Sequence, residues 1–178
     1  MSKTCIHSYS IPFLRTVTAS CILILSLLFS SDLHSSEYDV ENEVLNAAEG
    51  FFTALKEKRF TDVWESLTSK SRETIVNEVF NEINKKEARI GKEVVKEDFY
   101  KNGELARLYW NSFLKNFDPD IVLERSVWAI GKIKGNTATI ILKYEESEYN
   151  SELKLYKQDG RWHVGLVESF WIMKRYLK

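Results

Sequence analysis

The spacing of hydrophobic residues changes once along the chain, at Pro119. From Tyr38 to about Arg59, apolar side chains return every three or four residues and polar side chains fill the other positions, which predicts an amphipathic helix. Its apolar stripe consists of Val40, Val44, Ala47, Ala48, Phe51 and Leu55. We expect this helix to end at Lys58 and Arg59, because basic side chains stabilise the negative end of a helix dipole.

A second and a third helix are expected before residue 90. Thr61 or Asp62 can cap the second, and Ser69 or Ser71 can cap the third, because their side-chain oxygens accept bonds from free backbone amides. The apolar residues of the second are Val63, Trp64 and Leu67. Those of the third are Ile75, Val76, Val79, Phe80 and Ile83.

Gly91 interrupts the helical pattern, and residues 96–103 predict a loop with one helical turn. Gly103 then opens a last helix, which Pro119 ends because proline disfavours helix in the preceding residue. The expected apolar face of this helix consists of Leu105, Leu108, Tyr109, Ser112, Phe113 and Phe117.

After Pro119 the apolar residues alternate with polar ones, which predicts β-strands. Four strands are expected, at residues 121–134, 137–146, 152–157 and 161–173. The connections Lys134–Asn136 and Gln158–Gly160 carry Gly and Asn, which tolerate the positive φ of hairpin turns. Consecutive strands joined by such short connections form an antiparallel meander.

One face of this sheet is expected to be apolar and the other mixed. The apolar face carries Ala138, Ile140, Leu142, Tyr144, Leu153, Leu155, Trp162, Val164 and Leu166. The preceding helices carry matching apolar stripes that can cover it. The sequence therefore predicts an α+β fold, with N-terminal helices packed on a curved four-stranded antiparallel sheet.

Residues 1–36 differ from the rest. The uncharged apolar run Thr16–Phe29 follows Lys3 and Arg15 and precedes small polar residues, which is the order of a secretory signal peptide. The run is shorter than the roughly 20 residues that a membrane helix needs. A cleaved signal is favoured, with export of residues 37–178 to the periplasm or exterior. A retained inner-membrane anchor is the alternative.

Both cysteines, Cys5 and Cys21, lie in this leader, so the exported part would have no disulfide and no Cys-ligated metal site. Cys21 opens the apolar run instead of following it, which argues against a lipoprotein. The formal net charge of −1 gives no electrostatic footprint for nucleic acid. No motif for a cofactor or a metal ion is present, and none is expected.

Two stretches resemble the nuclear-transport-factor-2-like superfamily, which is also grouped with the cystatin-like folds. The opening pattern consists of Ala48, Phe51, Ala54, Leu55, Phe60, Trp64, Leu67 and Thr68, and the closing hairpin is Leu153–Leu166. The resemblance covers about Tyr38–Met173. It implies a cone, in which a curved sheet wraps a long helix and leaves a pocket at the open end. Residues 71–117 depart from small members as a longer helical insertion.

Glu168 is the strongest candidate for chemistry. If the alternation of the last strand continues, its carboxyl faces the apolar side, where burial would raise its pKa and suit it as a base, with Tyr144 as hydrogen-bond donor. Gly165 can instead mark a bulge that leaves Glu168 solvated or salt-bridged, which is the favoured interpretation. His163 alternates with apolar neighbours and is expected on the mixed face, as a surface or partner-contacting residue. Asp98 and Tyr100 lie on the predicted loop.

Aromatic side chains define the candidate ligand site. Trp64, Tyr109, Trp128 and Tyr144, together with Glu168, can line a pocket for an apolar molecule. Aromatic residues on core faces also simply fill volume.

The sequence thus favours an exported, non-catalytic binding or accessory domain. Its partner would be a small apolar ligand in the cone or an envelope protein at the cone mouth or sheet face, and a homodimer through the sheet is a further arrangement. Two alternatives stay open. One is a small isomerase or dehydratase with Glu168 as base, and the other is a membrane-anchored assembly subunit of a secretion system, if the leader is retained.

Overall fold

The computed structural model describes residues 38–85 and 90–170. The chain divides into two compact units, residues 1–40 and 41–178, and the description concerns the second. The predicted leader lies outside the described residues. Within the described ranges, no helix combines the length and the apolar character needed to cross a bilayer.

Four antiparallel strands form one sheet in the order β1-β2-β3-β4, which confirms the predicted meander. Their bounds are Ser126–Lys134, Thr137–Tyr144, Ser151–Gln158 and Arg161–Val164. The turns carry the expected positive φ angles, 56° at Gly135, 50° at Asp159 and 78° at Gly160. Positive φ at both central residues of the β3–β4 connection is the signature of a type I′ turn, whose twist matches that of the strands.

One face of the sheet forms the core. Ile140 pairs with Leu153 and Leu155 pairs with Val164, and all four side chains are fully buried. Ala138 and Leu142 share this face and are also buried. The alternation of the sequence therefore assigned these core-face residues correctly, but Leu166, which was predicted to share the face, begins α7 instead.

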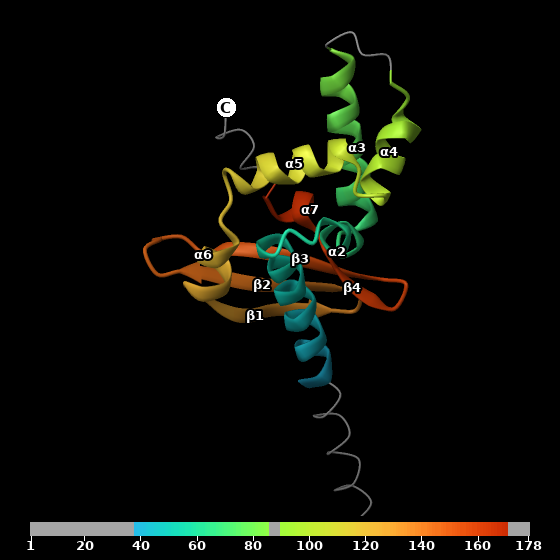
Figure 1. Ribbon diagram of the computed structural model, residues 1–178. Helices are drawn as coiled ribbons and strands as arrows, with labels where there is room; N and C mark the ends of the chain where they lie inside the picture. The colour runs from blue at the N-terminus through green and yellow to red at the C-terminus, as the bar shows by residue number, and fades with distance from the viewer. Residues whose placement is uncertain (1–37, 86–89, 171–178) are drawn as a thin grey trace, which may run out of the picture. The chain divides into compact units, whose positions relative to one another are not determined.

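Residues 38–56 are helical, and within the second unit residues 41–56 of this helix cross the core face (Figure 1). Its buried residues are Val44, Ala48, Phe51, Phe52, Ala54 and Leu55. Near β4, Glu43 accepts hydrogen bonds from Lys157 Nζ (3.1 Å) and Trp162 Nε1 (3.3 Å). Near β1, the ring of Phe52 meets that of Trp128 at 5.8 Å. The helix therefore packs across the whole width of the sheet.

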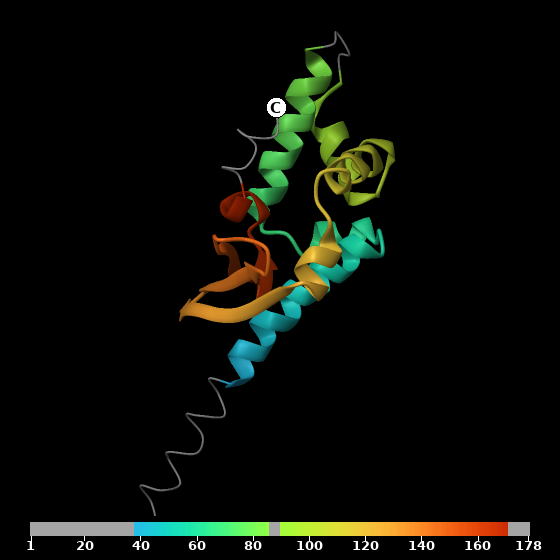
Figure 2. The same ribbon diagram turned by 90° about the vertical axis from the view of Figure 1, so that its left-hand side faces the viewer.

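The other face of the sheet has no described helix over it (Figure 2), and we refer to it as the open face. It is defined by Val127, Ala129, Lys134, Thr137, Thr139, Ile141, Lys143, Glu152, Lys154 and Tyr156.

The remaining helices are α2 (Phe60–Glu65), α3 (Ser69–Asn84), α4 (Lys92–Tyr100), α5 (Glu104–Leu114), α6 (Pro119–Glu124) and α7 (Leu166–Phe170). Helices α2 to α5 pack on one another, α6 packs on β1 and β2, and α7 packs on β3 and α3 (Figure 1). Helices packed against a four-stranded antiparallel sheet make an α+β fold, which confirms the predicted class.

The loop predicted at residues 96–103 is wrong, because α4 occupies most of it. Val95 and Phe99 stand one helical turn apart and are buried, so a short amphipathic helix satisfies both. Asp98 then caps α5, since its Oδ1 accepts a hydrogen bond from the backbone N of Ala106 at 2.8 Å. Tyr100 at the end of α4 remains 51% exposed.

The first strand was predicted to begin at Ile121, but it begins at Ser126 because α6 precedes it. Asp118 Oδ1 accepts a hydrogen bond from the backbone N of Asp120 at 2.9 Å. Pro119 occupies the first helical turn, where its missing N–H costs nothing. An N-cap followed by proline therefore outweighs the alternating pattern.

The last strand was predicted to reach residue 173, but β4 ends at Val164 and α7 follows. Gly165 N donates to Lys154 O at 2.8 Å, and Lys154 N donates to Ser169 Oγ at 2.8 Å. Helix α7 thus replaces β4 as the hydrogen-bonding partner of β3. Residues 171–173 lie outside the described residues.

The predicted helix caps need correction. The N-cap of α2 is Arg59, without a side-chain hydrogen bond, so neither Thr61 nor Asp62 has this role. The N-cap of α3 is Thr68, not either predicted serine, and its Oγ1 accepts from the backbone N of Ser71 at 3.0 Å.

The inner face of α5 also differs from the predicted one. Ala106 and Trp110 are its buried residues, whereas Leu108 is 60% exposed.

Adjacent positions of β2 give a direct test of the two faces. We expect Ile140→Ala to lower the free energy of unfolding by about 2–5 kcal/mol, because it leaves a cavity in the core. Ile141→Ala, on the open face, should cost less than about 1.5 kcal/mol. Urea denaturation of both variants measures the difference, and equal losses would contradict the assignment of the faces.

Candidate functional site

The aromatic residues of α2, α4 and α5 pack into a continuous cluster. Trp64 lies against Phe99 with centroids 4.7 Å apart, and Phe99 meets Tyr109 at 5.6 Å. Tyr109 meets Trp110 edge-on at 5.0 Å. Burial raises the pKa of the Tyr109 phenol well above its ordinary value, and the charge of Glu78 adds to this. These rings fill the space between the helices.

The other predicted lining residues lie elsewhere. Trp128 Nε1 donates to the carbonyl of Val122 at 2.8 Å, which fixes the indole under α6. Tyr144 ends β2, with the guanidinium of Arg125 5.1 Å from its ring centroid. Partial burial raises the pKa of the Tyr144 phenol, and a hydrogen bond with Glu146 adds to this. Ring contacts through Trp110, Phe113, Phe117 and Phe52 link Trp128 to the cluster of Trp64 and Tyr109. Tyr144 and Glu168 make their contacts elsewhere, with Arg125 and with the start of α3.

Glu168 stands on α7 and binds the start of α3. Its Oε1 accepts a hydrogen bond from Thr68 Oγ1 at 2.9 Å, and its Oε2 accepts one from Ser71 Oγ at 2.6 Å. Ser71 Oγ in turn accepts from the backbone N of Val167 at 3.1 Å. Thr68 and Ser71 are fully buried. Both carboxylate oxygens thus serve to join two helices, at the positive end of α3.

The Glu168 network should contribute measurably to stability. Glu168→Gln is expected to lower the free energy of unfolding by about 1–3 kcal/mol, because hydrogen bonds to a charged group are lost. In a double-mutant cycle, Glu168→Gln and Ser71→Ala should be less than additive, since they remove the same bond. Glu152→Gln, an exposed change on β3, is the control. Strict additivity would show that the two residues act independently.

His163 was expected on the mixed face as a surface or partner-contacting residue. Its pairing with Tyr156 confirms the face, but the expected surface exposure is wrong, since the residue is only 7% exposed. It pairs with Tyr156 across the β3–β4 ladder, and its Nδ1 lies 3.0 Å from Arg161 O. Burial lowers the pKa of the His163 imidazole, and the positive charges of Arg72 and Arg161 act in the same direction. The hydrogen bond to Arg161 O and the charge of Asp159 oppose this shift. The residue is therefore held neutral.

This lowered pKa predicts a pH dependence of stability. Below the ordinary pKa of about 6.5, the unfolded chain takes up a proton that the folded protein resists. The free energy of unfolding should therefore fall as the pH decreases through 6.5, and His163→Gln should flatten this part of the curve. Urea denaturation between about pH 5 and 7.5 and NMR titration of the imidazole measure the effect. An imidazole that titrates above 6.5 in the folded protein would refute it.

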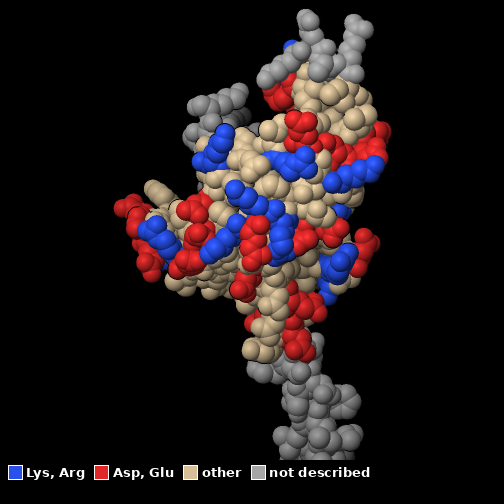
Figure 3. Space-filling model, in the orientation of Figure 1, with Lys and Arg blue, Asp and Glu red and all other residues tan. Residues whose placement is uncertain are grey.

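A cleft of about 560 Å3 lies between the end of helix 38–56 and the connection from α5 to α6. Its polar lining includes Lys56, Lys58 and Lys115. The Nζ of Lys56 lies 2.8 Å from Asp120 Oδ1 and 2.6 Å from Glu124 Oε1. Hydrogen bonds to these two carboxylates raise the pKa of the Lys56 ammonium above its ordinary value. Figure 3 shows basic and acidic side chains interspersed on this side of the molecule. Ion pairs with Asp120 and Glu124 therefore neutralise the ammonium of Lys56 in this cleft.

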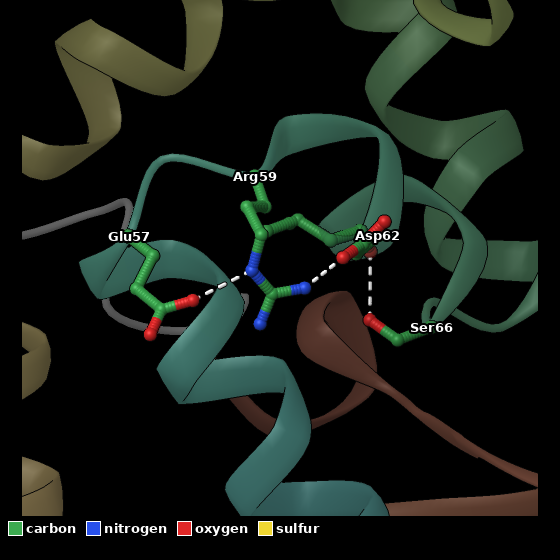
Figure 4. A network of polar contacts seen from close by, with 5 residues as sticks. Glu57, Arg59, Asp62 and Ser66 are labelled. Atoms are coloured by element: carbon green, nitrogen blue, oxygen red, sulfur yellow. Dashed lines mark hydrogen bonds and ion pairs between the residues drawn. The ribbon is translucent and has the colours of Figure 1, made fainter.

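A short polar network holds the connection from helix 38–56 to α2 (Figure 4). Arg59 Nε lies 2.6 Å from Glu57 Oε2, and its guanidinium also pairs with Asp62. Ser66 N donates to Asp62 O at 3.0 Å. Ion pairs this exposed contribute little to stability, so the role of this network is to shape the turn.

The open face carries a second, smaller groove, of about 240 Å3. Lys132, Lys134 and Lys154 line it together with Thr137 and Tyr156. None of the three lysine side chains forms an ion pair with any described residue. Three unneutralised ammonium groups beside two hydroxyls favour an anionic partner.

No group of His, Cys, Asp and Glu among the described residues has the arrangement of a metal site. No protein-family model, curated protein or solved structure matches the chain. The sequence pattern suggested neither the Glu168 network nor the lysine groove. The network joins residues 100 positions apart, and the groove depends on the register of β1, β2 and β3.

Proposed function

We propose that the protein is an exported, non-catalytic binding module that holds an acidic protein partner on the open face of its sheet. The observation that carries the proposal is the groove of Lys132, Lys134 and Lys154, whose ammonium groups find no carboxylate within the described part of the chain.

Apolar side chains share the open face with these lysines. Val127 is 63% exposed, Ala129 is exposed, and Ile141, which pairs with Ala129, is half-buried. Apolar surface bordered by charge is typical of protein–protein interfaces, where burial supplies affinity and charge supplies orientation. Lys143 adds a further positive charge to this face, and Glu152 is its one carboxylate among the residues that define it.

Two features argue for binding through a surface and not through chemistry or an internal pocket. The rings of Trp64 and Tyr109 pack directly on Phe99, so they support a filled core. Both oxygens of Glu168 accept hydroxyl hydrogen bonds, so a proton transfer by this carboxylate would disrupt the start of α3.

Export is part of the proposal and is supported by the basic start and apolar run of residues 1–36. We also propose a relationship to the nuclear-transport-factor-2-like superfamily. A long helix packed on an antiparallel meander and the turn at Asp159 and Gly160 are consistent with it.

Poly-L-glutamate is a suitable probe of the open face. We expect saturable binding that weakens as salt rises, with backbone amide shifts concentrated on β1, β2 and β3. The double variant Lys132→Glu, Lys134→Glu should bind at least about tenfold more weakly. Lys58→Glu, Lys115→Glu changes two lysines at the other cleft and should bind as the unmodified chain does. Equal losses in the two double variants would mean that the open face has no special role.

A further inference from the structure

The two outer edges of the sheet differ. On the β4 side, Val164 N donates to Ser66 O at 2.8 Å and Thr68 N donates to Val164 O at 3.0 Å, so the segment before α3 closes this edge. Where β4 ends, α7 continues the protection of β3. On the other side, β1 pairs with β2 alone among the described strands. The outer edge of β1 therefore has backbone groups that remain available to a further strand.

The side chains along this free edge are apolar on both faces. Val127 and Ala129 are exposed on the open face, and Trp128 and Ile130 are half-buried on the core face. Natural sheets usually protect such an edge with charges or bulges. Here the regular pairing is interrupted between Ile130 and Ile133, so the protection covers only the end of the strand.

Beyond this irregularity, the charge of the edge is positive. Lys132 and Lys134 are both exposed there, and Lys154 lies on the same face two strands away. A strand added to β1 would place apolar residues beside Val127–Ile130 and its remaining residues beside these lysines. Acidic residues in that second part would complement the charge.

A second copy of this chain fits the edge less well. If the β1 strands of two copies paired about a twofold axis, only the regularly paired part of each strand could align. The overlap is limited because α6 ends at Glu124, just before β1 begins. Such pairing would also place the lysine-rich open faces of both copies on the same side of one sheet, where like charges repel.

We propose that the free edge of β1 binds an extended segment of the partner protein as a fifth strand, with alternating apolar residues beside Val127–Ile130 and acidic residues beside Lys132 and Lys134. This inference rests on the proposed function and specifies how the partner binds. Main-chain hydrogen bonds supply affinity in this mode, and the side chains supply selectivity.

The test uses the full chain and a synthetic peptide in which glutamates precede alternating valine and threonine. We expect the peptide to bind, to slow hydrogen exchange of β1 amides and to shift the resonances of Ser126–Ile130. A peptide with lysine in place of glutamate should bind about tenfold more weakly or not at all. A peptide N-methylated at alternate residues keeps its charge but cannot pair as a strand, and it should not bind.

The Lys132→Glu, Lys134→Glu variant should reverse the preference and bind the lysine peptide. If the N-methylated peptide binds as well as the parent and the β1 amides gain no protection from hydrogen exchange, the inference about the edge is overturned. The proposed binding on the open face would then be retained. If neither poly-L-glutamate nor any acidic peptide binds, both proposals fail. A dimer of the chain that the peptide dissociates would assign the edge to a second copy and overturn the inference.

Discussion

The architecture depends on a few polar contacts at the end of β4. There the chain segment before α3 pairs with Val164 through two backbone hydrogen bonds, and Glu168 accepts the hydroxyls of Thr68 and Ser71. These contacts give every polar side-chain atom of the buried threonine and serine a partner, which burial requires. They also join the helical part of the molecule to the sheet, because α3 begins at the same point where the last strand stops.

This junction makes the sheet asymmetric. The edge at β4 is closed by residues 66–68 and by α7, and the core face is covered by helix 38–56 and α6. What remains uncovered by described residues is the open face and the neighbouring edge of β1. Lysines without ion pairs and exposed apolar residues are concentrated on that remaining surface. The proposed binding function therefore rests on the part of the fold where, among the described residues, backbone groups have no strand partner and lysine side chains have no ion pair.

The spacing of apolar residues in the sequence correctly predicted those helices and strands that bury one face in the core. The alternation of Ile140 and Leu142 and the stripe through Val44, Phe51 and Leu55 each identified a buried face. Local polar chemistry was harder to predict, because one hydrogen bond can outweigh a pattern. Asp118 with Pro119 replaced the start of a strand with a helix, and the contacts of Gly165 and Ser169 with Lys154 replaced the end of another. The candidate site was the least predictable part, since no local pattern indicates that Glu168 reaches α3 or that three lysines converge across three strands.

The hydrogen bond between Thr68 and Glu168 spans 100 positions of the sequence. The ribosome makes Glu168 long after Thr68, so the first helices emerge before the carboxylate that will anchor α3. Closing so long a loop carries an entropic cost and delays native docking. Until Glu168 has emerged, the buried hydroxyls of Thr68 and Ser71 lack the carboxylate that holds them in the folded protein.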